Sequence, residues 1–251
     1  MNTLITRRQR TVRRAGAVTA GSAAIAAASY WALMSSYSQL FGSFPYRGSR
    51  EERLVALTFD DGPNDPYTSQ IADFLRQCDI KATFFQVGRC VERHPEMTLR
   101  LANEGHVIGN HSYSHQFSRC WNAATLRHEI ARTQGILGQL LGRAPALYRP
   151  PWLLRTPAVF DILQAEGLHP VSGEFCHALE VFQPAPERIA RRAVAKTRPG
   201  SVLIFHDGYD SHGGNRASTV DAVKVAADRL SAAGYRFVTV DQLLGLPAYQ
   251  G

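Results

Sequence analysis

Two adjacent aspartates, Asp60 and Asp61, stand between an apolar run and Gly62-Pro63 in the stretch Leu-Thr-Phe-Asp-Asp-Gly-Pro. Residues 54–59 are apolar and β-prone, which predicts a buried strand, and the following Gly-Pro pair predicts a turn. Adjacent carboxylates at the end of a buried strand repel each other and lose hydration. We therefore expect a cation to hold at least one of them.

Two histidines, His111 and His115, follow a second apolar run at residues 106–109. Histidines four residues apart can lie on one face of a helical turn and converge on one metal ion. With one carboxylate they form a three-ligand site for Zn²⁺ or a similar divalent ion, and a coordination position stays open for water. The second aspartate is then available as a base toward that water.

Two further polar groups follow predicted strands. His206-Asp207 comes after residues 201–205, and histidine is the usual proton donor to a leaving group near neutral pH. Arg149 begins the stretch Arg-Pro-Pro-Trp, where it could orient a carboxylate while Trp152 forms an apolar or sugar-stacking wall. Taken singly, His206 also fits a hydrogen-bonded strand end, and Arg149 a surface ion pair.

The elements that must position these residues alternate along the chain. Strands are predicted at residues 54–59, 81–87, 106–109, 146–148, 169–171, 201–205 and 236–240. Helices are predicted around residues 71–78, at 90–104 with an interruption near Pro95, and at 123–141, 157–166, 186–196 and 219–234. This alternation predicts an α/β fold with mainly parallel strands, whose chemistry gathers at the carboxyl ends of the strands.

Together these motifs resemble the polysaccharide deacetylases of the NodB-homology type, carbohydrate esterase family 4. The motifs appear in the family's order, and the resemblance covers about residues 51–245. They are Thr58-Phe59-Asp60-Asp61-Gly62-Pro63, His111-Ser112-x-x-His115, Arg149-Pro150-Pro151-Trp152 and Leu203-Ile204-Phe205-His206-Asp207.

The resemblance implies an incomplete, distorted (β/α) barrel with one divalent metal, commonly Zn²⁺. It makes Asp60 the general base, steadied by Arg149, and His206 the general acid, and it places at Trp152 a backbone N–H that helps to hold the oxyanion. The implied metal ligands are Asp61, His111 and His115. The implied reaction is removal of N-acetyl groups from a poly- or oligosaccharide containing N-acetylglucosamine, such as peptidoglycan, chitooligosaccharide or an exopolysaccharide.

The chain departs from the family in the segment between the third and last motifs. The family usually has an Asp-Trp element there, and residues 171–182 contain none. Glu174 or Glu180 could replace the acid, and Phe175 or Phe182 the aromatic ring. The candidate substrate-binding residues are Trp152, Pro151, Phe175 and Phe182, and the supporting residues are Glu174, Glu180 and Asp207. An O-acetyl esterase, another amidase or a non-catalytic sugar-binding envelope protein are the alternatives.

The basic and uncharged N-terminal segments predict where in the cell the catalytic domain lies. Residues 1–14 are basic and residues 15–34 carry no charge, which predicts a signal anchor or a signal peptide. A linker is expected at residues 35–50 and the catalytic domain at 51–248, outside the cytoplasm in the cell envelope or secreted. A membrane is a partner only if the hydrophobic segment is uncleaved.

The distribution of charge argues against a nucleic-acid-binding protein, and the cysteine spacing argues against a zinc finger. The net charge of +7 comes from seven arginines in residues 1–50, so the rest of the chain is neutral and a nucleic-acid partner is not expected. The four cysteines lack the close paired spacing of a zinc finger, and their pairing stays open.

Overall fold

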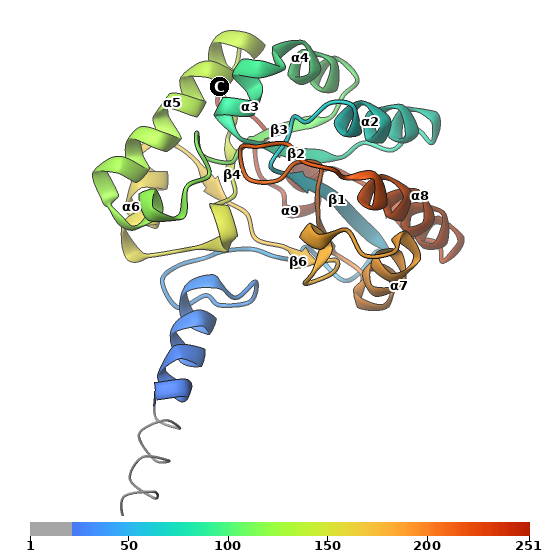
Figure 1. The fold of residues 1–251 in the computed structure, drawn as a ribbon, viewed down its shortest axis with the longest axis horizontal. Helices are drawn as coiled ribbons and strands as arrows, with labels where there is room; N and C mark the ends of the chain where they lie inside the picture. The colour runs from blue at the N-terminus through green and yellow to red at the C-terminus, as the bar shows by residue number, and fades with distance from the viewer. Residues whose placement is uncertain (1–21) are drawn as a thin grey trace, which may run out of the picture.

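The computed structural model describes residues 22–251. A parallel sheet forms its centre, in the order β5-β4-β3-β2-β1-β7-β6, and β8 pairs with the first residues of β1 (Figure 1). The strands are β1 (Leu54–Asp60), β2 (Thr83–Gln86), β3 (Val107–Asn110), β4 (Leu147–Tyr148), β5 (His169–Pro170), β6 (Glu174–Phe175), β7 (Ser201–His206) and β8 (Arg236–Phe237). The end strands β5 and β6 do not pair with each other, so the barrel stays open, and the predicted incomplete barrel is confirmed.

Helices lie along the outside of the curled sheet (Figure 1). They are α2 (Tyr67–Gln77), α3 (Gly88–Arg93), α4 (Pro95–Asn103), α5 (Ala123–Leu141), α6 (Pro157–Ala165), α7 (Pro186–Lys196) and α8 (Ala217–Ala232). The short helix α9 (Val240–Leu244) instead packs against the inner face of the sheet, where Val240 and Leu243 share a core cluster with Ala56. The predicted helix at 90–104 is interrupted at His94, because Pro95 starts a new helix at the position where its missing N–H does no harm. Gly142, with φ 69°, ends α5 where the sequence predicts.

β1 occupies the middle of the core because its side chains are covered on both faces. All residues from Val55 to Asp60 are buried. Phe59 stacks against Phe84 of β2 and Phe205 of β7, with ring centroids 4.9 and 6.0 Å apart. Such stacking holds the three strands in one register, and their carboxyl ends therefore meet at one edge.

Two predicted elements differ in the structure, and one strand is not predicted. The strand expected at 236–240 stops after Phe237, and a helix begins at Val240 with Thr239 as its cap. β6 is a two-residue strand that periodicity cannot detect. The segment from His111 to His115 is an irregular loop and not a helical turn, since Ser112 and His115 have φ values of 68° and 51°.

The chain before the predicted domain packs against it. Residues 22–34 form an exposed helix, and no helix among residues 22–251 has both the length and the apolar character needed to cross a membrane. The basic segment 1–14, and the part of the hydrophobic segment before residue 22, lie outside the described residues. Within the expected linker 35–50, Phe44 is fully buried, so this segment contributes to the core.

Candidate active site

Asp61, His111 and His115 form one cluster at the carboxyl ends of β1 and β3. The Asp61 Oδ1 atom lies 3.3 Å from His111 Nε2 and 3.2 Å from His115 Nε2, and all three residues are buried. Burial by itself would raise the pKa of Asp61, but the neighbouring His115 and His111 outweigh it and hold that pKa well below its usual range. The carboxylate is therefore ionised between the two rings.

The backbone around this cluster requires two glycines. Asp61 has a left-handed φ of 75°, which turns its side chain away from Asp60 although the two are adjacent. A Cβ on Gly208 would lie 2.2 Å from the Asp61 carbonyl oxygen, and a Cβ on Gly62 would lie 2.1 Å from Asp207 Oδ2. The loops after β1 and β7 consequently approach each other only because both positions are glycine.

The three side chains fit a divalent metal. Asp61 Oδ1 has no hydrogen-bond partner among the described residues, although it is buried. His111 Nδ1 lies 2.6 Å from the Arg149 carbonyl oxygen, and His115 Nδ1 lies 2.8 Å from Asp210 Oδ1. The His111 contact places that ring's proton on Nδ1 and leaves its Nε2 free to bind a metal, while Asp210 lies within ion-pair distance of His115 without a hydrogen bond to Nδ1. One carboxylate and two imidazoles with this support are a usual set for Zn²⁺.

Asp60 is held by a buried arginine. Arg149 Nη1 donates to Asp60 Oδ1 at 2.6 Å and to Thr58 Oγ1 at 2.7 Å. Its remaining donors reach the carbonyl oxygens of Val171 and Ser172, at 3.3 and 3.0 Å, so the fully buried guanidinium has partners on every side. The pair fixes the position of the Asp60 carboxylate next to the Asp61-His111-His115 cluster.

His206 is held by Glu180. The Glu180 carboxylate accepts the backbone N–H of His206 at 3.1 Å and contacts its Nδ1 at 3.0 Å, while the Thr219 hydroxyl donates to the same carboxylate. Burial by itself lowers the pKa of His206, but Glu180, and then Asp61 and Asp60, outweigh it and raise the pKa to about 9. The imidazole is therefore protonated at neutral pH, as a general acid must be.

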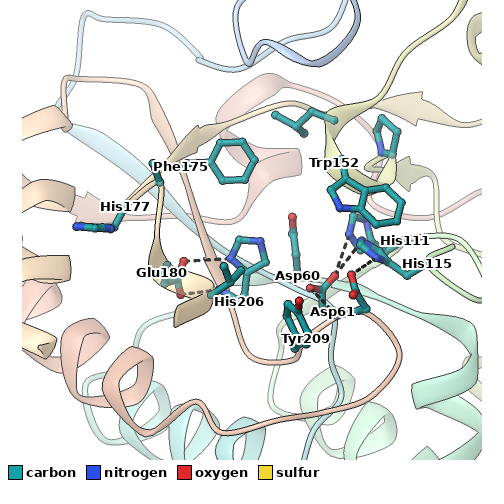
Figure 2. Close-up of a pocket in the computed structure, with 15 residues that line it drawn as sticks. Asp60, Asp61, His111, His115, Trp152, Phe175, His177, Glu180, His206 and Tyr209 are labelled. Atoms are coloured by element: carbon teal, nitrogen blue, oxygen red, sulfur yellow. Dashed lines mark hydrogen bonds and ion pairs between the residues drawn. The ribbon is translucent and has the colours of Figure 1, made fainter. Parts of the chain in front are cut away.

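These groups line a cavity of about 270 Å³. Figure 2 shows Asp60 between the His206 ring and the cluster of Asp61, His111 and His115, with Trp152 and Phe175 on the side opposite Tyr209. The Trp152 ring lies 4.2 Å from that of His115, and the Phe175 ring is parallel to that of His206 at 6.1 Å. The cavity thus has an apolar wall facing its charged floor.

Four predicted residues lie elsewhere. Pro151 is buried at the start of the 3₁₀ turn η2 (Pro151–Leu153), and Phe182, in η3 (Glu180–Phe182), is 78% exposed outside the cavity lining. Glu174 pairs with Arg47 at 2.9 Å. Asp207 is buried beneath the site, where burial raises its pKa to about 7. Of the two candidate glutamates, Glu180 lines the cavity, and it contacts His206 and not Arg149.

Asp210 and Tyr209 also line the cavity and are not among the residues predicted from the sequence. Asp210 supports His115 through its carboxylate, and its backbone N–H donates to Asp61 Oδ2 at 3.1 Å. The position of both residues directly after His206-Asp207-Gly208 was the available signal, because a loop that follows a strand end in a parallel fold borders the site.

Comparison with known proteins identifies the family. The polysaccharide deacetylase family model matches residues 47–171. A peptidoglycan-N-acetylglucosamine deacetylase of Bacillus cereus is 34% identical over 194 residues, which are 77% of this chain and 89% of that protein. The chain belongs to the polysaccharide deacetylase family. The family resemblance predicted from the motifs is thereby confirmed, and the carbohydrate N-deacetylase prediction with it at the level of the family.

Other family members and structures agree with this assignment. A chitooligosaccharide deacetylase of Azorhizobium caulinodans is 28% identical to this deacetylase-family chain, over 75% of the chain and 93% of that protein. The crystal structure of the Bc1960 peptidoglycan N-acetylglucosamine deacetylase has a TM-score of 0.76 at 33% identity, covering 82% of this chain and 94% of that one. A family 4 pseudoenzyme from Bacillus anthracis, 22% identical with a TM-score of 0.72, shares the fold.

Proposed function

We propose that this deacetylase-family chain removes N-acetyl groups from N-acetylglucosamine residues of an envelope polysaccharide, with one divalent metal, most favourably Zn²⁺. The observation that carries the proposal is the order of charged groups along one cavity: the Asp61-His111-His115 cluster, then Asp60, then His206. A hydrolytic site needs a polarising centre, a base and an acid within reach of one bond, and this cavity supplies side chains for all three.

Each residue has a defined task in this reaction. A metal held by Asp61, His111 and His115 would supply Lewis-acid polarisation of the acetamide carbonyl and of water. Asp60 takes the proton from the attacking water, and Arg149 keeps that carboxylate pointed into the cavity. His206 donates its proton to the departing amine, for which Glu180 keeps the imidazole protonated. Trp152 and Phe175 pack against the apolar faces of the sugar.

Peptidoglycan is the substrate we favour, because peptidoglycan deacetylases are among the relatives of similar length. A chitooligosaccharide deacetylase covers the chain to a similar extent, so chitooligosaccharide is the second candidate. Peptidoglycan lies outside the cytoplasm, so this substrate places the catalytic domain there, with the segment before residue 30 as its anchor or export signal.

The decisive experiment is acetate release by the full chain, stripped of metal and then refilled with Zn²⁺. Peptidoglycan and chitooligosaccharides are assayed in parallel, and Asp60→Asn serves as the inactive control. We expect acetate from at least one substrate, only with metal and only with Asp60 present. Bound metal without acetate from either glycan would favour a non-catalytic sugar-binding protein. Acetate released from O-acetylated but not N-acetylated sugars would favour the esterase.

A further inference from the structure

A second hollow continues the catalytic cavity toward the N-terminal segment. This hollow, of about 420 Å³, shares three of its lining residues with the cavity: Trp152, Phe175 and Ala178. Its far wall comes from residues 30–37, which precede the region matched by the family model. In Figure 1 this segment runs beneath the sheet near β6, beside the strand that carries Phe175.

Residues 30–37 are fixed in this position by buried hydrogen bonds. Arg155, fully buried, donates its side-chain N–H groups to the carbonyl oxygens of Ser35 and Ser38 and its backbone N–H to that of Leu33. The Ser172 hydroxyl donates to the Ser36 carbonyl oxygen at 2.9 Å. The segment is therefore a built wall of the hollow, held by the domain next to the loop that carries Trp152.

The wall presents aromatic surface to the hollow. Tyr37 is 50% exposed, and its ring is braced edge-on by Tyr46 at 5.1 Å. Tyr30 adds a second exposed ring to the same lining. A braced ring beside a hollow provides the flat apolar surface on which a sugar ring packs, and Trp152 provides a second such surface at the boundary between the two spaces.

The charge of the hollow points to the kind of sugar. Lys196 is the single charged residue among the described residues that line it. Arg192 and Arg188 lie four and eight residues earlier on α7, on the same side of the helix, and both are exposed without a carboxylate partner among the described residues. A sugar bearing a carboxylate in this hollow is attracted to the Lys196 ammonium, whose Nζ donates to the Phe175 carbonyl oxygen at 2.9 Å, whereas a neutral sugar is not.

We infer that residues 30–37, Trp152 and Lys196 form a second sugar subsite, which holds the neighbouring residue of the same glycan strand and prefers one bearing a carboxylate. The inference rests on the proposed function, because the strand must enter the catalytic cavity for its next residue to reach the hollow. It assigns to the segment before the catalytic domain a part in substrate selection.

The test compares three glycans: chitotetraose, a peptide-free tetrasaccharide of alternating N-acetylglucosamine and N-acetylmuramic acid, and the same tetrasaccharide with its carboxylates amidated. Binding to the zinc-loaded full chain is measured by calorimetry, and acetate release is measured in parallel. The variants are Tyr37→Ala, Tyr37→Phe and Lys196→Gln. Lys224→Gln, a change at an exposed lysine on α8, is the matched control.

We expect Tyr37→Ala to weaken binding of all three tetrasaccharides about three- to tenfold, and Tyr37→Phe to restore it. Lys196→Gln should remove a preference of about two- to fivefold for the carboxylated over the amidated glycan, and Lys224→Gln should keep it. Equal binding by wild type and Tyr37→Ala, or no preference for the carboxylate in the wild type, would overturn the inference. Because calorimetry needs no turnover, glycan binding without acetate release would contradict the proposed function alone.

Discussion

Asp60 and His206 are direct partners in the register of β1 and β7, so the proposed base and acid stand side by side at the ends of neighbouring strands. Each is held by a residue of opposite charge: Arg149, which is buried behind the cavity, contacts Asp60, and Glu180, which lines the cavity, contacts His206. Arg149 orients the proposed base, and Glu180 raises the pKa of the proposed acid to about 9, so that both groups are positioned for general acid–base catalysis.

The Glu180 contact predicts the pH dependence of the reaction. A general acid must be protonated, so its activity falls as pH rises through its pKa, which is about 9 for His206. Glu180→Gln removes the carboxylate that raises this pKa. We therefore expect the alkaline limb of kcat/KM to move to lower pH by about one unit or more.

The control for this prediction is Glu166→Gln, which changes a carboxylate at the far end of α6 outside the cavity lining. Its pH profile should match that of the wild type. An unchanged alkaline limb in Glu180→Gln, with activity retained, would contradict the acid role of His206.

The same contact has a consequence for folding. His206 binds its proton more tightly in the folded than in the unfolded protein, so the contact stabilises the fold fully below about pH 6.5, the pKa of unfolded histidine. This contribution is lost as pH rises through about 9. The unfolding free energy is measured by chemical denaturation at pH 6 and at pH 10. Its decrease between these two pH values should be smaller in Glu180→Gln than in the wild type, because the variant lacks the His206–Glu180 contact.

The Asp60–Arg149 pair separates catalysis from stability. Asp60→Asn removes the base but keeps a side-chain oxygen that can accept from Arg149, so we expect a rate loss of about 10²-fold or more with the metal retained, and a smaller destabilisation than in Arg149→Met. Arg149→Met leaves the Asp60 charge buried without a partner, which costs about 3–5 kcal/mol of unfolding free energy. Metal analysis, acetate assay and denaturant unfolding of both variants check this. A destabilisation by Asp60→Asn equal to that of Arg149→Met would contradict it.

Much of this site could be predicted from the sequence because strand ends and residue types determine it. The apolar run before Asp60 and the alternation of elements were enough to place Asp60, His111, Arg149 and His206 at one edge of a parallel sheet. The local path was not predictable, because left-handed residues such as Asp61 and His115 carry no reliable signal in their side chains. The two histidines therefore meet through an irregular loop instead of the expected helical turn.

The sequence also does not show which glutamate stands in the place of the family's Asp-Trp element. Glu174 and Glu180 are the same residue type and only six residues apart, so the sequence leaves both open. In the structure, Glu174 faces Arg47 of the N-terminal segment while Glu180 faces His206. Packing of the segment before residue 51 was missed because Gly, Pro and Ser are typical of linkers, although Phe44 among them is fully buried.

We predict that Asp210 supports metal binding although it is not one of the three proposed ligands. Its carboxylate lies within ion-pair distance of His115 Nδ1, so Asp210→Asn should lower metal affinity about 10- to 100-fold without loss of folding. Competition with a chelator of known affinity measures this. Asp79→Asn, at an exposed position, is the control. Metal affinity unchanged in Asp210→Asn would mean that His115 needs no such support.

We predict that no residue larger than glycine fits at position 208 without moving the loop that carries Asp61. A Cβ there would lie 2.2 Å from the Asp61 carbonyl oxygen, a backbone atom that can move only if the ligand loop moves. We expect Gly208→Ala to lower the unfolding free energy by about 2 kcal/mol or more and to weaken metal binding. Gly135→Ala is the matched control, because a Cβ at this position in α5 meets nothing within 4 Å. That change should instead stabilise the protein by up to about 1 kcal/mol through helix propensity. If the two alanine variants had equal stability and metal affinity, the close approach of the β1 and β7 loops would not be needed to hold Asp61.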